Sequence, residues 1–208
     1  MDIEASERPP QNARFSQFWA YAVAFGSLWG AVEVTAGSFL HALRIPFAGV
    51  LLASLGAAIL VAERQVFDRR GLTLVTGVIA ASCKTLSPAG IIWNPMIAIV
   101  VEALLAETAM VVTSRSRLAA AAAGLLAAGW SVTQGLLSQY ILYGWTVFTL
   151  YITVVGKTAT WLGLERRTGW VALLAVLALF LALGAAGGVW GLRIGRLSRQ
   201  RLKGRADA

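Results

Sequence analysis

The stretch FSQFWAYAVAFGSLWGAVEVTAGSFL, residues 15–40, decides the fold class of this protein. Glu33 is the only charged side chain in it, and most of the other residues are apolar or small. A helix needs about 20 mostly apolar residues to cross the hydrocarbon core of a bilayer, which is roughly 30 Å thick. Because the stretch exceeds that length, it predicts a transmembrane helix.

The composition extends this prediction to the whole chain. Of the 208 residues, 58% are hydrophobic and only 13% are charged, and the mean hydropathy is +0.70. A soluble domain carries about a quarter charged residues, so this chain has too little polar surface to face water throughout. Cys83 and His41 are the only residues of their types, which excludes a disulfide framework and most cysteine or histidine metal sites. We expect no metal and no cofactor.

Six apolar stretches predict an all-α polytopic fold, a bundle of six transmembrane helices in one membrane domain, residues 15–192. The predicted spans are 15–40, 46–62, 71–87, 92–114, 118–140 and 169–192. Residues 1–14 are polar and are expected to form a cytoplasmic N-terminal segment. Residues 193–208 are expected to form a basic cytoplasmic tail.

A further apolar piece, 145–164, lies between the fifth and sixth spans, and the positive charges decide how it is placed. The chain has 18 Lys and Arg against 10 Asp and Glu, a net charge of +8, and six of the cations fall in the last sixteen residues. Cationic loops stay on the cytoplasmic side. With six spans and a cytoplasmic N-terminus, 13 of the 18 cations lie on the cytoplasmic side. A seventh span would instead place the basic tail, residues 193–208, on the outer side. We therefore expect both termini in the cytoplasm and 141–168 as an outer loop or interfacial helix.

Small residues form two stripes on the predicted first helix. Helical spacing aligns one stripe around the single charge, formed by Ala22, Gly26, Gly30, Glu33 and Gly37. The stripe roughly opposite is formed by Ala20, Ala24, Ser27, Ala31, Thr35 and Ser38. Small faces let helices approach closely in lipid, where the hydrophobic effect contributes little. Either both faces pack inside the protein's own bundle, or one face docks another membrane protein.

Four ionisable side chains fall inside predicted spans, and they are Glu33, Lys84, Glu102 and Glu107. A charge at the bilayer centre costs about 2.5–3.5 kcal/mol, so each group must be paired, protonated or facing a polar cavity. The predicted depths allow Lys84 to form an ion pair with Glu33 or with Glu102. A polar pocket in which these groups bind a ligand is the other interpretation. Glu107 points elsewhere, and we expect it to contact a neighbouring helix or the inner cationic loops.

The segment 85–95, between the third and fourth predicted spans, holds Pro88, Trp93, Asn94 and Pro95 and no charge. Prolines stop the helices and free backbone groups that cannot remain unsatisfied in lipid. One hypothesis makes the segment part of a lid over an outward-facing pocket. The polar residues around that pocket would be Lys84, Gln134, Ser138, Gln139, Tyr140 and His41. The alternative is an interfacial turn in which Trp93 is a belt aromatic.

Together, the six short Gly- and Ala-rich spans resemble an S component, the substrate-binding subunit of energy-coupling factor (ECF) vitamin transporters. The likeness includes GSLWGAVEVTAGSFLHALRIPFAG, residues 26–49, and KTLSPAGIIWNPMIAIVVEA, residues 84–103. It implies a pocket near the outer surface for a small vitamin-like nutrient. The residues that we expect to bind it are Glu33, Lys84, Trp93, Asn94, Glu102, Gln134, Ser138 and Tyr140. It also implies that Ala20 and Ala24 contact a transmembrane coupling subunit, which works with two cytoplasmic ATPases. Other chains would supply these ATPases, because this chain has no phosphate-binding GxxxxGK[ST] element of its own.

Two other functions are kept as alternatives. A non-catalytic scaffold or assembly factor would bind its partners through the glycine stripes and anionic lipid through the basic tail. An intramembrane lipid-processing or proteolytic enzyme would need a nucleophile with a base, or a metal cluster. One His, one Cys and no HExxH motif argue against it. We expect a non-enzymatic, multi-pass protein of the bacterial cytoplasmic (inner) membrane, and the position of the cations argues against a nucleic-acid partner.

Overall fold

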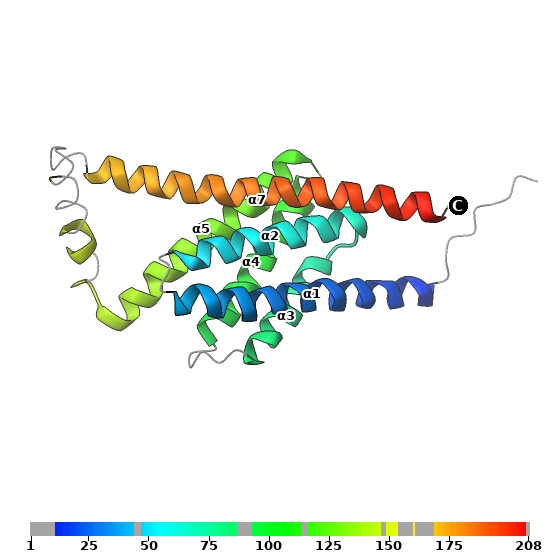
Figure 1. Cartoon of the computed structure of the whole chain (residues 1–208), viewed down its shortest axis with the longest axis horizontal. Coiled ribbons are helices and arrows are strands. Elements are labelled where there is room, and N and C mark those ends of the chain that lie inside the picture. The colour runs from blue at the N-terminus through cyan, green and yellow to red at the C-terminus, as the bar shows by residue number, and fades with distance from the viewer. Residues whose placement is uncertain are drawn as a thin grey trace, which may run out of the picture.

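The computed structural model describes residues 11–43, 47–86, 93–113, 116–146, 149–153, 160 and 169–206. The elements in chain order are α1 (Gln11–Ala42), α2 (Ala48–Val66), α3 (Leu72–Cys83), the 3-10 helix η1 (Lys84–Leu86), α4 (Trp93–Val112), α5 (Arg117–Tyr143) and α7 (Gly169–Ala206). These described ranges contain no β-strand. The predicted all-helical fold is confirmed, and Figure 1 shows the helices gathered into one bundle.

Five helices are long and apolar enough to cross a membrane, namely α1, α2, α4, α5 and α7. The chain is therefore a multi-pass membrane protein by the length and composition of its helices. The predicted third span, 71–87, corresponds to α3 and η1 together, an apolar stretch over Leu72–Leu86 that is shorter than the other five. The backbone tightens into a 3-10 turn at Lys84, which ends the regular helix early. Where the sequence predicts six spans, the second and third of them short, the described structure has five helices of spanning length and one shorter apolar helix.

Two helices continue beyond the predicted spans. α2 extends to Val66 instead of ending at residue 62, so Glu63 and Arg64 belong to the helix. α7 extends to Ala206, through most of the segment that the sequence predicts as a basic tail. Residues 193–206 contain no proline and are rich in Arg and Leu, which are strong helix formers. The charged ends of α2 and α7 are therefore parts of rigid elements.

Local features set the ends of α5. The Ser116 hydroxyl accepts a hydrogen bond from the Ala119 amide at 3.0 Å and so caps the first turn. Gly144 ends the helix with a φ of +64°, a left-handed backbone that glycine adopts without steric cost. Only short pieces of the predicted outer segment 141–168 follow among the described residues. Most of 145–164, which the sequence assigns to an outer loop or interfacial helix, lies outside the described residues.

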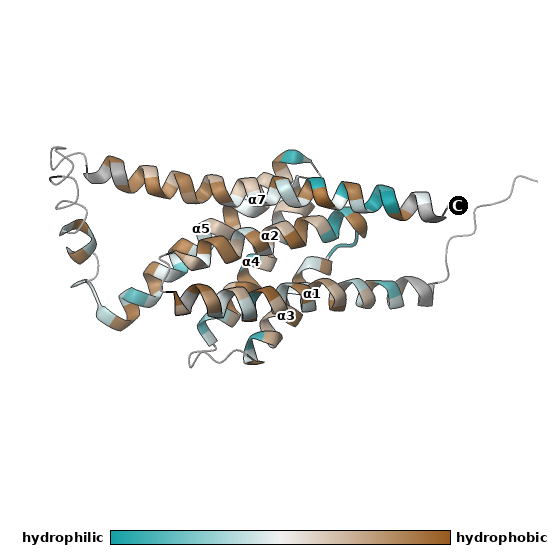
Figure 2. Ribbon diagram, in the orientation of Figure 1, coloured by the Kyte–Doolittle hydropathy of each residue, from teal (hydrophilic) through white to brown (hydrophobic). Residues whose placement is uncertain are grey.

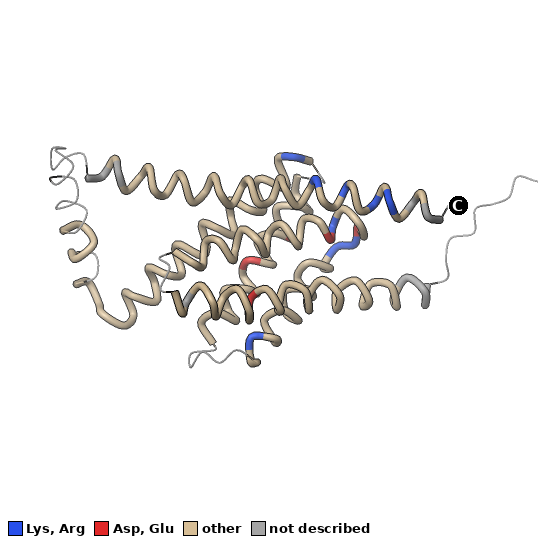
Figure 3. Tube along the Cα trace, viewed as in Figure 1, with Lys and Arg blue, Asp and Glu red and all other residues tan. Residues whose placement is uncertain are grey.

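The central position in the bundle belongs to α2, which contacts α1, α3, α4, α5 and α7. In Figure 1, the beginning of α1, the end of α2 and the end of α7 lie at the same end of the molecule. Figure 3 shows Lys and Arg positions on α7 and on the α2–α3 connection gathered at this end. Figure 2 shows hydrophobic residues along the middle of the helices. One end of the bundle is therefore basic, and its centre is apolar with isolated polar positions.

Close backbone contacts hold α7 against both α5 and α2. Gly188 faces the backbone of Ala120, so a side chain at this glycine would overlap the Ala120 carbonyl. A Cβ added at Gly187 would lie 2.6 Å from the Ser54 carbonyl oxygen on α2. Contacts between small residues supply the packing energy that the hydrophobic effect cannot supply in lipid. The glycines of α7 therefore serve close packing against its two neighbours.

Candidate functional site

The two small-residue stripes of α1 have different surroundings. All members of the stripe that contains Glu33 are buried, and Gly26 and Gly30 pack directly against Ile79 and Cys83 of α3. In the second stripe, Ser38 is half-buried and the other members are exposed, namely Ala20, Ala24, Ser27, Ala31 and Thr35. One small face is thus used inside the bundle, while most of the other is open on the surface of the described structure.

Lys84 forms a buried ion pair with Glu33. Its ammonium group lies 3.1 Å from Glu33 Oε2 and donates a hydrogen bond of 2.8 Å to the Glu33 carbonyl oxygen. Gly37 leaves room for this contact, because a Cβ at that position would lie 3.1 Å from Lys84 Nζ. Of the two partners that the sequence allows, the described structure selects Glu33. Lys84 is therefore not a free cation that waits for an anionic ligand.

Glu102 on α4 is the third member of this polar region, and only 5% of its surface is exposed. It interacts electrostatically with Glu33. Among the described residues, the Glu102 side chain forms no hydrogen bond and no ion pair. We call Glu33, Lys84 and Glu102 the Lys84 group. It combines two carboxyl groups with one ammonium group inside the bundle.

Trp29 lies one helical turn before Glu33 on α1 and is 0% exposed. A Cβ added at Gly56 of α2 would lie 2.7 Å from its indole Nε1, and one added at Gly77 of α3 would lie 3.6 Å from its Cζ3. Its Nε1 has no hydrogen-bond partner among the described residues. The sequence did not single out Trp29, because it belongs to neither small-residue stripe of this helix. The signal was the pair of glycines on neighbouring helices that leave room for the ring.

A second polar cluster lies where α2 ends and α3 begins. Glu63 and Arg64 are buried, and the Thr76 hydroxyl donates a hydrogen bond of 2.6 Å to Glu63 Oε1. Arg64 lies 3.6 Å from Glu107 Oε1 and 3.6 Å from Asp68 Oδ1. The sequence reasoning missed Glu63 and Arg64 because it ended the second span at residue 62. No proline or glycine stops the helix there, which was the available signal.

Glu107 ties α4 to this cluster. Its carboxylate accepts a hydrogen bond of 2.7 Å from the Gly71 amide and a short one from the Thr73 hydroxyl, both at the start of α3. A carboxylate at a helix N-terminus also interacts favourably with the helix dipole. The expectation that Glu107 contacts a neighbouring helix or the cationic loops is confirmed. We call the cluster of Glu63, Arg64, Thr73, Thr76 and Glu107 the Arg64 group.

A third cluster joins the start of α4 to α5, and we call it the amide group: Asn94, Gln134 and Ser138. Gln134 Nε2 donates hydrogen bonds of 2.6 Å to the Asn94 carbonyl oxygen and 2.7 Å to its Oδ1. Asn94 Nδ2 donates one of 2.8 Å to Ser138 Oγ. Gln134 Oε1 is buried without a hydrogen-bond partner among the described residues. Three predicted binding residues are thus in direct contact.

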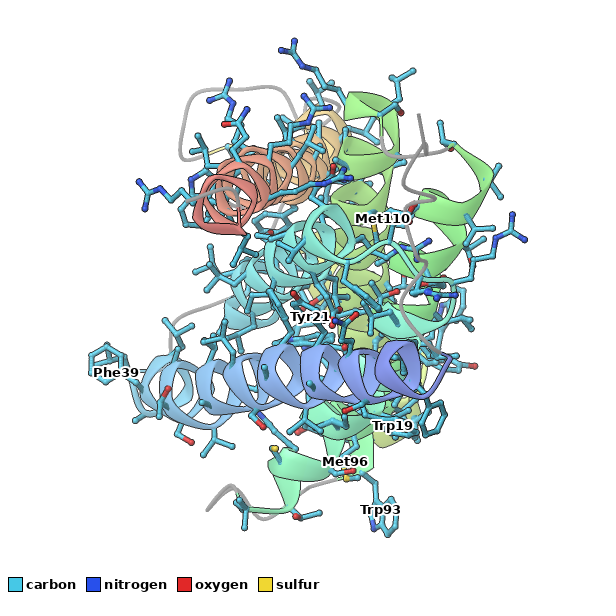
Figure 4. The ribbon with its side chains drawn as sticks, turned by 90° about the vertical axis from the view of Figure 1, so that its right-hand side faces the viewer. Trp19, Tyr21, Phe39, Trp93, Met96 and Met110 are labelled. Atoms are coloured by element: carbon cyan, nitrogen blue, oxygen red, sulfur yellow. The ribbon has the colours of Figure 1, made fainter. Side chains whose placement is uncertain are left out.

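Two predicted aromatic binding residues are exposed. Trp93 is 77% exposed, and Figure 4 shows it projecting away from the helices near Met96. Tyr140 is also exposed. Residues 87–92 of the proposed lid lie outside the described residues, as does the side chain of His41. Gln139 accepts a hydrogen bond of 3.0 Å from the Tyr151 hydroxyl.

The predicted binding residues form two separate clusters. Asn94 and Glu102 are both on α4, but eight residues correspond to about 12 Å along the helix. Among the described residues, no hydrogen bond or ion pair joins the amide group to the Lys84 group. The described part of the chain also holds no group of three or more His, Cys, Asp or Glu placed to bind a metal ion. Comparisons with protein-family models, curated proteins and solved structures gave no match.

Proposed function

We propose that the chain is a substrate-binding membrane subunit for uptake of a small vitamin-like micronutrient through an ECF-type transporter. The observation that carries this proposal is the open small-residue face of α1, which contains Ala20 and Ala24. α1 already packs on the bundle through its other face, and small faces in lipid serve close helix contacts. A second membrane chain, the coupling subunit, is therefore the proposed occupant, and cytoplasmic ATPases supplied by other chains provide the energy.

The proposed topology has six crossings, with α3 and η1 as the shorter third crossing and both termini in the cytoplasm. The beginning of α1 and the end of α7 lie at the same end of the bundle, which suits an even number of crossings. The Lys and Arg positions at this end suit the cytoplasmic side of a bacterial inner membrane.

The proposed substrate site uses the amide group with Trp93 and Tyr140. Amide and hydroxyl groups offer donors and acceptors for a polar or heterocyclic ligand, and exposed aromatic rings can stack on it. Gln134 Oε1 supports this site because it is a buried acceptor without a partner among the described residues. Glu102 would contribute a carboxyl group deeper along α4. Lys84 would take part only if its ion pair with Glu33 opens.

The first experiment is purification from the native membrane with mild detergent. The proposal predicts that a coupling subunit and two ATPases co-purify, and that mass spectrometry detects a small bound nutrient. Isolation with an unrelated complex and without a bound molecule would favour the scaffold alternative. Neighbouring genes for an ATPase pair provide an independent check.

The second experiment tests the partner face directly. Replacing Ala20→Leu and Ala24→Leu together adds bulk to the open face of α1, so the coupling subunit should no longer co-purify while ligand binding persists. The matched control is Ala178→Leu with Ala182→Leu, two exposed alanines with the same spacing on α7. Retention of the coupling subunit by the α1 variant would contradict the proposal.

A further inference from the structure

Buried ionisable groups occur at two levels of the bundle. The Lys84 group holds Glu33, Lys84 and Glu102, and the Arg64 group holds Glu63, Arg64 and Glu107 among its members; all six side chains are buried. Figure 3 shows acidic positions both in the middle of the bundle and close to its basic end. Ionisable residues inside a membrane are costly and mark ion or proton pathways in many transporters. Two such groups in one small bundle call for a common explanation.

The two groups follow one another along the bundle. Glu102 and Glu107 are five residues apart on α4, which corresponds to about 7.5 Å along the helix. Glu102 interacts electrostatically with Glu33, and Glu107 does so with Glu63. At one end, Lys84 is followed directly by exposed residues of η1. At the other end, Arg64 is paired with Asp68, whose side chain is 48% exposed. The groups therefore lie at successive levels of the bundle, in a line that has exposed residues next to both of its ends.

Unpartnered polar atoms lie along this line. Glu63 Oε2, Arg64 Nε and Trp29 Nε1 are all buried and have no hydrogen-bond partner among the described residues. Trp29 packs against Gly77, the direct neighbour of Thr76, whose hydroxyl binds Glu63. Trp29 also lies one helical turn before Glu33 on α1, so the indole is near members of both groups. Buried polar atoms without a protein partner are normally satisfied by internal water. Such water would connect the two groups past Trp29.

We propose that this line of buried carboxyl groups transfers protons between the two ends of the bundle, past the buried indole of Trp29. In each step, a carboxylic acid gives its proton to a water molecule or to the next carboxylate and becomes a carboxylate itself. Only O–H bonds break and form, so no oxidant or further reactant is needed. Glu102 and Glu63 are the exchanging groups, because each has carboxyl oxygen without a partner among the described residues. Glu107, which accepts from Gly71 and Thr73, is the fixed member.

Proton flux into proteoliposomes tests the proposal, and the proton itself is the probe. Vesicles loaded with potassium and the pH-sensitive dye pyranine are diluted into sodium buffer, and valinomycin then makes the interior negative. Wild-type protein should acidify the interior several-fold faster than protein-free vesicles. Glu102→Gln keeps the size of the side chain but cannot exchange a proton, so its rate should fall to that of protein-free vesicles.

Thr108→Val on the same helix α4 is the matched control, because Thr108 is exposed, lies outside both groups and donates its hydroxyl hydrogen bond to the Leu104 carbonyl oxygen. Its rate should stay close to the wild-type rate. Wild-type flux equal to that of protein-free vesicles, or full flux in Glu102→Gln, would overturn the proposal. If Glu102→Gln fails to elute as a folded species in gel filtration, Glu63→Gln provides the same test. The assay contains no nutrient and no coupling subunit, so its outcome is independent of the proposed function.

Discussion

The ion pair between Lys84 and Glu33 illustrates what a single buried contact does in this protein. Both side chains are almost fully buried, and the ammonium group contacts both the carboxylate and the backbone carbonyl of Glu33. Forming such a pair stabilises little relative to apolar residues, but removing one partner leaves the other charge uncompensated in a medium of low dielectric constant. The pair therefore fixes the position of η1 against α1.

This argument predicts a non-additive effect. Lys84→Met should lower the free energy of unfolding by about 3–5 kcal/mol, because Glu33 is then buried without its partner. Lys84→Met combined with Glu33→Gln should recover most of that loss. Thermal unfolding in detergent, analysed as a double-mutant cycle, measures both effects. Equal stability of Lys84→Met and the wild-type protein would show that the pair does not form.

A second prediction at this scale concerns ligand affinity. Ser138 accepts a hydrogen bond from Asn94 Nδ2, so Ser138→Ala frees the amide and loosens the proposed binding site. Loss of about one hydrogen bond should weaken binding of the co-purified small molecule by up to about ten-fold, as measured by isothermal calorimetry. Thr133→Val on the same helix is the control, since its hydroxyl bonds only to the backbone of Gly129. Equal affinities in both variants would place the ligand elsewhere.

At the scale of elements, glycines determine which helices touch. Gly188 lets α7 meet the backbone of α5, and Gly191 lets it meet the backbone of Ala58 on α2. On α1, by contrast, the small residues divide between a buried face and an open face. The same residue type thus serves internal packing on one helix and, in the proposed function, a partner contact on another. Surroundings, rather than residue type, separate the two uses.

The glycine contacts predict opposite signs for one substitution at two positions. Gly188→Ala should destabilise the protein by about 1–3 kcal/mol, because the new methyl group overlaps the backbone of Ala120 and pushes α7 outward. Gly135→Ala should raise stability by up to about 1 kcal/mol, because nothing lies within 4 Å of the added carbon and alanine favours helix. Melting temperatures of the two variants in detergent provide the comparison. A stabilising Gly188→Ala would contradict the described packing of α7.

At the scale of the whole molecule, the charges are distributed along the bundle axis. α7 has 38 residues, which corresponds to about 57 Å and exceeds the hydrocarbon core of roughly 30 Å. Its final turns carry exposed cations, including Arg196, Arg199 and Arg201. The helix therefore extends past the bilayer if it crosses steeply, and its basic end meets the headgroups or the aqueous phase.

The proposed topology predicts which positions react from which side. In a Cys83→Ser background, Arg199→Cys on α7 should react with a membrane-impermeant maleimide only in inverted vesicles. Thr85→Cys, at the exposed end of η1, should react only in intact cells stripped of their outer membrane. Labelling is measured by the mass shift of the purified protein. Reaction of both cysteines from the same side would exclude the proposed six crossings.

Properties that repeat along one helix could be predicted from the sequence alone. The all-helical membrane character follows from long apolar stretches. The buried stripe of α1 follows from the 3.6-residue period, which aligns Ala22, Gly26, Gly30, Glu33 and Gly37. A contact of Glu107 with a neighbouring helix or with the cationic loops also follows from its place in α4, although not the choice of α3 as the partner. In each case the information lies within a few turns of one helix.

Only the tertiary structure decided which buried groups meet. Lys84 contacts Glu33 across a separation of 51 residues and leaves Glu102 without a partner among the described residues. Glu63 and Arg64 are buried because α2 continues about one turn beyond residue 62, where it packs against α3 and α4. Such pairings depend on the rotation and depth of each helix relative to its neighbours, and these are set by the packing of all helices together. No local pattern in the chain carries that information.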